Sequence, residues 1–283
     1  MKENTAVSSY NALQVGFRHP FGQGLTFQAS YTWSHAIDDI SYNWFRFFVD
    51  DSNLRRWRAT SDLNRTQMLV MNFVYALPFF KRSSNRFARN ALSGWQMSGI
   101  TSFFSGTPIF EAVGSGCGIS GFGNGIGTPG LRCNSLAPVK IKKGVDNDPQ
   151  FGPTPTWFDA NSFAQPLEPQ LRANGQPGMF GYMGRNPLTA PGRNNWDMAL
   201  LKNFQLPWFG GEHSTLQFRW ETFNTFNHPQ WQGVNLFCNG SPNADGTPAF
   251  GRPCGGHQYN LGNGQVNSAW PSRIMQFALK LVF

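Results

Sequence analysis

The last nine residues of the chain, 275–283, alternate strictly between two kinds of side chain. One face of an extended segment here carries Met275, Phe277, Leu279, Leu281 and Phe283, and the other carries Gln276, Ala278, Lys280 and Val282. Successive side chains of a strand point to opposite faces, so this period of two predicts a strand with one apolar face. Such an ending is unusual for a soluble domain, because chain termini are commonly polar and frayed.

Six further segments show the same period of two. The seven predicted strands cover residues 13–17, 25–34, 69–77, 95–103, 196–206, 216–221 and 275–283. Lys202 interrupts the apolar face of the fifth predicted strand and counts against that strand assignment. The connections are short, long, intermediate, long, short and long in turn. Transmembrane β-barrels have short periplasmic turns and long external loops, so the order predicts an all-β, antiparallel transmembrane barrel segment with long external loops.

The composition agrees with a barrel wall. Only 13% of the 283 residues are charged, against about 25% in ordinary soluble domains, and 15% are aromatic. No apolar run is long enough for a transmembrane helix. The net charge of +8 forms no stripe typical of nucleic-acid binding. The nearest cluster, Arg55, Arg56 and Arg58, is interpreted as a solvated loop, with contact to an anionic lipid or ligand as the alternative.

Aromatic residues fall near both ends of the predicted strands. The outer rim would carry Tyr31, Trp33, Phe103 and Trp196, and the inner rim Phe17, Tyr75, Trp95, Phe204 and Trp208. Aromatic girdles at both interfaces are typical of membrane barrels. Strand parity then directs one set of side chains to lipid, namely Phe27, Tyr31, Phe73, Phe218 and Phe277. The opposite set faces the lumen, namely Gln28, Thr32, Gln217, Arg219 and Lys280.

The odd strand number predicts an incomplete barrel. Seven strands do not close a bacterial barrel, whose strand number is even and whose edges must all be paired in lipid. The first five residues also lack the apolar core of a secretory signal. The chain is therefore expected to be the last third of a larger barrel, and its first and last strands are expected not to pair with each other.

Several stretches resemble the C-terminal barrel of TonB-dependent receptors, specifically the Oar-like group of acidobacteria. The matching segments are 10–15, 24–34, 94–100, 105–108, 184–186, 191–192, 194–197, 218–221, 223–229 and 276–283. The resemblance implies that residues 1–283 form part of a 22-stranded outer-membrane barrel of a Gram-negative bacterium. It also implies an N-terminal plug and a TonB-contacting segment, neither of which is recognisable in this chain.

The resemblance further implies a set of partners. Outer-membrane lipid and lipopolysaccharide would contact the wall, and an unknown ligand would bind the external loops. The barrel-assembly machinery would recognise the C-terminal strand through Phe283. The TonB system would act only through the missing N-terminal parts, and no nucleic acid is expected as a partner.

The four cysteines occur as two pairs with matched spacing. Cys117 and Cys133 lie in one predicted external loop, and Cys238 and Cys254 lie in another. Their spacing does not suggest zinc. An external loop is an oxidising setting in which disulfides persist. Four cysteines allow three connectivities, and the local one, Cys117–Cys133 with Cys238–Cys254, is favoured.

No catalytic, cofactor-binding or metal-binding residue is predicted. The glycine-rich segment 121–127 lacks the strand, helix and lysine of a phosphate-binding loop. The pairs Asp38-Asp39 and Asp50-Asp51 lack the spacing of a calcium loop. Arg219 and Glu221 share the predicted lumen face, where they form either a salt bridge with each other or a pair that contacts solute.

The predicted function is that of barrel wall and ligand-facing loops in a TonB-dependent receptor-like protein, with no enzymatic activity. The alternative is a secreted β-sandwich or adhesin-like carbohydrate-binding module that stacks glycans on Trp44, Trp57 and Trp157. The two differ in whether the apolar strand faces are exposed to lipid or buried against a second sheet.

Overall fold

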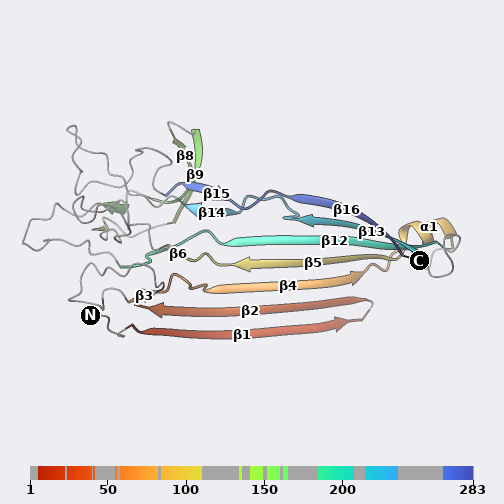
Figure 1. The fold of residues 1–283 in the computed structure, drawn as a ribbon, viewed down its shortest axis with the longest axis horizontal. Helices are drawn as coiled ribbons and strands as arrows, with labels where there is room; N and C mark the ends of the chain where they lie inside the picture. The colour runs from red at the N-terminus through yellow and green to blue at the C-terminus, as the bar shows by residue number, and fades with distance from the viewer. Residues whose placement is uncertain are drawn as a thin grey trace, which may run out of the picture.

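One antiparallel sheet of seven long strands dominates the computed structural model (Figure 1). Its strands follow one another in chain order as β1 (Ser8–Phe21), β2 (Leu25–Asp38), β4 (Gln67–Ala76), β5 (Trp95–Phe104), β12 (Arg193–Gln205), β13 (Thr215–Phe223) and β16 (Ile274–Val282). The described residues are 6–22, 24–39, 41, 55, 58–81, 84–109, 134–135, 141–148, 152–159, 162–164, 184–206, 214–234 and 264–282. All seven predicted strands are present.

The connections separate into two kinds at opposite ends of the sheet. The end that carries α1 (Arg86–Leu92) has the shorter ones, and Gly24 turns β1 into β2 with a φ of 85° that glycine adopts without strain. The other end, called the loop end here, receives the long connections after β2, β5 and β13 (Figure 1). The predicted alternation of short and long connections is confirmed.

The pairing register gives the sheet one continuous apolar face. Phe27 of β2 is opposite Phe73 of β4, which in turn is opposite Gly99 of β5. On β13 and β16, Phe218 is opposite Leu279 and Trp220 is opposite Phe277. The ten side chains that parity assigned to lipid or lumen fall on two opposite faces, as predicted.

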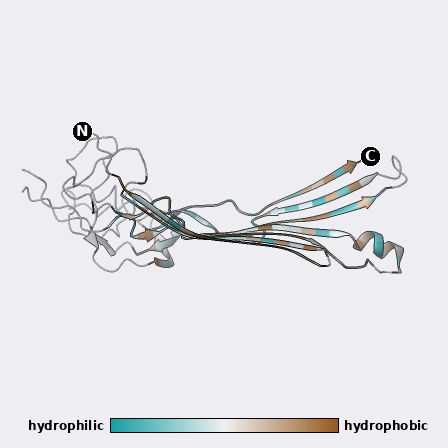
Figure 2. Cartoon of the chain, turned by 90° about the horizontal axis from the view of Figure 1, so that it is seen from below, coloured by the Kyte–Doolittle hydropathy of each residue, from teal (hydrophilic) through white to brown (hydrophobic). Residues whose placement is uncertain are grey.

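The long strands form a single layer. In the edge-on view of Figure 2, no second sheet or helix layer drawn from the described residues covers the central part of the strands. Apolar side chains at both edges are correspondingly exposed, with Val15 of β1 at 51% and Phe277 of β16 at 68%. A β-sandwich requires a second sheet against this face, and the described part of the chain supplies none, which argues against the alternative fold.

The sheet is open. Among the described residues, β1 pairs only with β2 and β16 pairs only with β13, so these two strands are its edges. The expectation that the first and last strands do not pair with each other is confirmed.

Small strand pairs lie at the loop end. They are β3 (Ala59–Thr60) with β2, β6 (Pro108–Ile109) with β11 (Leu188–Thr189), β7 (Asn134–Ser135) with β10 (Phe163–Ala164), β8 (Ile141–Asp148) with β9 (Gly152–Phe158), and β14 (Trp231–Val234) with β15 (Val266–Ala269). The buried hydrophobic side chains of the described residues, Ile109, Trp157, Phe158 and Leu188, all belong to these pairs. The apolar core therefore sits at the loop end and not within the seven-stranded sheet.

The part of the chain that the structure describes contains no helix of sufficient length and apolar character to cross a membrane.

Candidate ligand site at the loop end

A buried ion pair joins the end of β2 to the long connection after β5. Asp38 is the last residue of β2, and Arg185 lies far along the chain, between β10 and β11. The Arg185 guanidinium contacts the Asp38 carboxylate directly and also donates to the Asp38 backbone carbonyl at 2.7 Å. Both residues are less than a tenth exposed. The connection after β5 is thereby held against the end of β2.

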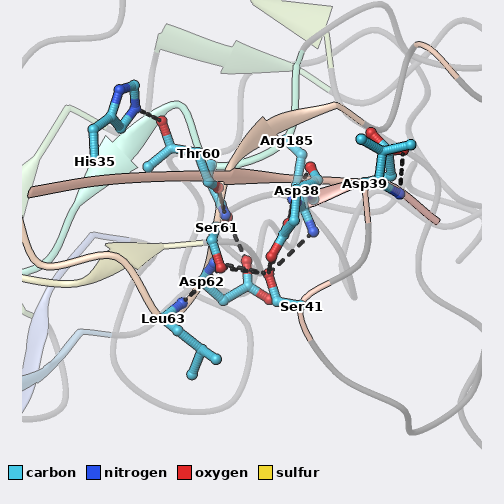
Figure 3. A network of polar contacts seen from close by, with 11 residues as sticks. His35, Asp38, Asp39, Ser41, Thr60, Ser61, Asp62, Leu63 and Arg185 are labelled. Atoms are coloured by element: carbon cyan, nitrogen blue, oxygen red, sulfur yellow. Dashed lines mark hydrogen bonds and ion pairs between the residues drawn. The ribbon is translucent and has the colours of Figure 1, made fainter. Parts of the chain in front are cut away.

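Hydroxyl groups complete this ion pair (Figure 3). Ser41 Oγ donates to Asp38 Oδ2 at 2.9 Å and lies 3.2 Å from Ser61 Oγ. Burial alone would raise the pKa of Asp38, but hydrogen bonds from Ser61, Arg185 and Ser41 and the positive charge of Arg185 outweigh burial. The pKa of Asp38 therefore lies below its ordinary value. Asp38 is five residues past Trp33, beyond the part of β2 assigned to the membrane.

A second set of contacts joins the connection after β5 to the one after β13. The backbone N–H of Trp157 in β9 donates to the carbonyl of Gly264 at 2.8 Å, and Thr156 forms a β-bridge with Gln265. The indole rings of Trp157 and Trp231 meet at 89° with centroids 6.0 Å apart. All three long connections thus form one assembly at the loop end.

The connections after β5 and β13 and the adjoining strand ends line an open cavity of about 650 Å³. Its aromatic lining consists of Tyr31, Phe103, Phe104, Trp157 and Trp231, and its polar lining includes Gln67, Lys143, Arg193, Asn194, His228 and Gln230. Tyr31 was predicted to face lipid. It lies on the apolar face of β2, as parity predicted, and at the loop end this face also borders the cavity.

The cavity carries positive charge and unused hydrogen-bonding atoms. Lys143 and Arg193 line it, whereas none of its described lining residues is Asp or Glu. Three polar atoms of lining residues are buried without a hydrogen-bond partner, namely Arg193 Nε, His228 Nε2 and Gln230 Oε1. Buried polar atoms in proteins are almost always paired, so an unpaired group calls for a partner. Their gathering here indicates a place for a polar ligand or for ordered water.

Arg219 and Glu221, the predicted lumen residues, lie together on the polar face of β13 but away from this cavity. They form an ion pair in which about half of the Arg219 side chain is exposed, and Glu221 also accepts a hydrogen bond from Gln276 of β16. The salt bridge, one of the two alternatives that the sequence left open for this pair, is present. Contact between this pair and a solute stays a prediction.

Several predicted site residues lie outside the described residues. These are Cys117, Cys133, Cys238 and Cys254, the terminal Phe283, and the tryptophans Trp44 and Trp57. Their disulfides and their roles stay predictions. Trp157, the third proposed glycan-stacking tryptophan, is described and lines the cavity. Within the described residues, no three His, Cys, Asp or Glu side chains come together as metal ligands.

No sequence pattern predicted a role for Arg185, Arg193, Gln230 or Trp231. A signal existed for Arg185, because Gly184-Arg185-Asn186 is among the segments with a family resemblance, as is Asn194-Asn195-Trp196-Asp197 directly after Arg193. The structure brings these segments to the loop end. Asn186 donates to the Thr60 carbonyl at 2.6 Å, and Asn195 accepts from Gln230 Nε2 at 3.1 Å.

Comparison with known proteins supports the membrane assignment. The chain matches the family described as outer membrane beta barrel domain over residues 1–276. No curated protein and no solved structure matches it. The family match spans nearly the whole chain and agrees with the antiparallel, single-layered sheet. The chain therefore belongs to the outer-membrane β-barrel domain family.

Proposed function

We propose that the chain forms the wall and the ligand-facing loops of an outer-membrane transporter of the TonB-dependent receptor type. The observation that carries this proposal is the loop-end assembly, in which the long connections after β5 and β13 line an open cavity at one end of a membrane wall. A passive wall has no need of a folded binding region. The resemblance to Oar-like receptors points in the same direction.

The open edges of the sheet support a larger barrel. Unpaired backbone N–H and C=O groups cost several kcal/mol each in hydrocarbon. Each edge strand, β1 and β16, pairs on one side only among the described residues. Further strands would complete the wall, with β16 presented to the barrel-assembly machinery and the apolar face contacting lipid and lipopolysaccharide. The proposed role is binding and passage of a ligand, without catalysis.

Energy-dependent uptake tests this proposal. The gene that encodes this chain in its complete reading frame would be expressed in a Gram-negative host, with and without a functional TonB system. We expect ligand accumulation to require TonB, while the amount of receptor in the outer membrane stays unchanged. Equal accumulation in both strains would identify a passive pore and overturn the proposal.

A further inference from the structure

We propose that the loop-end cavity binds a short acidic saccharide. This inference rests on the proposed function, because it names the class of ligand that the external loops would capture. The volume of about 650 Å³ lies within the range of roughly 300–1,000 Å³ that is common for small-molecule sites. Three features of the lining select the ligand, namely the indole corner, the unpaired polar atoms and the charge.

The first feature is a corner made by two indoles. Trp157 and Trp231 lie with their rings nearly perpendicular and in edge-to-face contact, so the edge of one indole covers part of the face of the other. Trp157 is held in place because its Nε1 donates to the Thr189 carbonyl at 2.7 Å and the side chain is largely buried. The face of an aromatic ring carries partial negative charge, which attracts C–H groups. The C–H face of a sugar ring fits such a surface.

The second feature is a mixture of unpaired donors and acceptors. Gln230 is 4% exposed, and its Nε2 donates a hydrogen bond to Asn195 Oδ1, whereas its Oε1 accepts no hydrogen bond. This oxygen is itself buried, so a ligand donor would reach it through a bridging water or after a shift of the side chain. Arg193 Nε is an unpaired donor and requires an acceptor. A hydroxyl group supplies both functions, so a ligand with several hydroxyl groups fits better than a simple aromatic acid.

The third feature is the charge of the lining. Lys143 holds its Nζ 5.2 Å from the centroid of the Trp157 ring, and Arg193 packs over Trp270 at 4.3 Å. Two cations and no lining carboxylate among the described residues favour an anionic ligand. Lys143 Nζ lies over one face of the Trp157 ring, so a carboxylate on a sugar that stacks on the remaining indole surface would pair with it. An acidic saccharide satisfies all three features.

Binding to purified protein tests the inference without any transport step. The complete barrel that contains this chain would be produced in outer membranes from the complete reading frame and extracted in detergent, and its folding checked by heat-dependent migration in gels. The ligands are trigalacturonate and, as a neutral trimer, cellotriose, measured by calorimetry at low and high salt. We expect trigalacturonate to bind with a Kd below about 1 mM and to weaken with salt. Cellotriose should bind more weakly.

Matched lysine variants isolate the charge. Lys143 is exposed, so Lys143→Gln should leave folding intact and lower the affinity for trigalacturonate by about fivefold, with a smaller effect on cellotriose. Lys81→Gln makes the same charge change in the connection after β4, at the opposite end of the sheet. This control should bind trigalacturonate like the parent protein.

Two further variants test the indole and the amide. Trp157→Phe keeps a ring and should weaken both trimers less than Trp157→Ala, which should cost at least about tenfold. Gln230→Leu should weaken both trimers. Folded protein that binds neither trimer, equal effects of Lys143→Gln and Lys81→Gln, or equal affinity for both trimers would overturn the inference. Intact binding with TonB-independent uptake would overturn only the proposed transport function.

Discussion

Lys202 of β12 lies with its Nζ 5.4 Å from the centroid of the Trp95 ring on the neighbouring strand β5. Trp95 and Phe218 flank it in the same row of the apolar face, and their rings pack edge to face at 5.9 Å. Lys202 is consequently 2% exposed. Its Nζ donates to the carbonyls of Asn90, Ala91 and Ser93 at the end of α1. The ammonium group thus caps a helix terminus, where carbonyls lack partners.

Replacing Lys202 tests this capping role. Lys202→Met keeps the apolar stem but removes the ammonium donor from the three carbonyls, of which Ala91 keeps Trp95 Nε1 as a donor. We therefore expect unfolding in lipid to become easier by about 1.5–3 kcal/mol. Urea titration of the protein in liposomes measures the loss. Lys280→Met, on the polar face of the exposed strand β16, is the matched control and should change little. If Lys202→Met were more stable than the parent protein, the buried charge of Lys202 would be destabilising on this face.

Gly99 and Phe73 form a second testable pair. A Cβ atom at Gly99 would lie 2.7 Å from Phe73 Cε1, because the phenyl ring covers the glycine on the next strand. Gly99→Ala should therefore destabilise the sheet by about 1–3 kcal/mol through overpacking. Gly16→Ala is the control, since its Cβ would have nothing within 4 Å.

A double-mutant cycle checks the cause of this effect. Gly99→Ala should cost less in a Phe73→Leu background, because the smaller side chain leaves room for the methyl group. Equal costs in both backgrounds, measured by the same urea titration, would mean that the ring is not responsible.

Adjacent residues of β4 test which face contacts lipid. Met71 lies on the apolar face and Asn72 on the polar face, both near the middle of the strand. Met71→Arg should cost about 2–4 kcal/mol near the middle of the bilayer, whereas Asn72→Arg should cost little. Folding titrations in liposomes compare the two. Similar costs for both variants would contradict a lipid-facing apolar side.

The Asp38–Arg185 ion pair predicts that the stability of the loop end depends on pH. The folded pKa of Asp38 is below its ordinary value, so the carboxylate contributes stability above the unfolded pKa of about 3.9. This contribution is lost as the pH falls through the lower, folded pKa. Hydrogen exchange at residues 58–66 and 184–189 should therefore accelerate in strong acid but not between pH 5 and pH 8, a range that lies roughly one unit or more above this window.

Substitutions at the same pair provide the control. Arg185→Ala leaves a buried carboxylate without its partner and should cost about 3–5 kcal/mol, more than the joint replacement Asp38→Asn with Arg185→Met. Asp38→Asn cannot titrate and should remove the acid dependence of exchange at these residues. Persistence of that dependence in Asp38→Asn would assign it to another group.

Cysteine cross-linking tests whether the sheet closes on itself. Val15 and Tyr31 are register partners on β1 and β2, so cysteines at these positions should form a disulfide. Cysteines at Val15 and Leu279 place the partners on the two edge strands and should stay reduced. The purified chain should also give no single-channel conductance. A cross-link between β1 and β16, or stable conductance, would mean a small complete barrel.

The sequence alone determined the seven strands, their faces and the alternation of short and long connections. A period of two is a local property, so Phe27 and Gln28 are assigned to opposite faces without knowledge of any partner strand. The register then aligns these faces across the sheet. Lys202 was the exception, since its charge argued against the fifth strand. The charge of Lys202 is compensated by the Trp95 ring and by the carbonyls at the end of α1. No alternation pattern encodes these contacts.

Only the tertiary structure decided the loop end. Arg185 reaches Asp38 across 147 residues of sequence, and Trp157 meets Trp231 from a different long connection. Loops have no period, so nothing in the sequence indicates which of their side chains meet. The same limit explains why Arg193 and Gln230 were not recognised as lining one cavity. Strand faces follow from local backbone geometry, whereas the cavity depends on how three distant segments pack together.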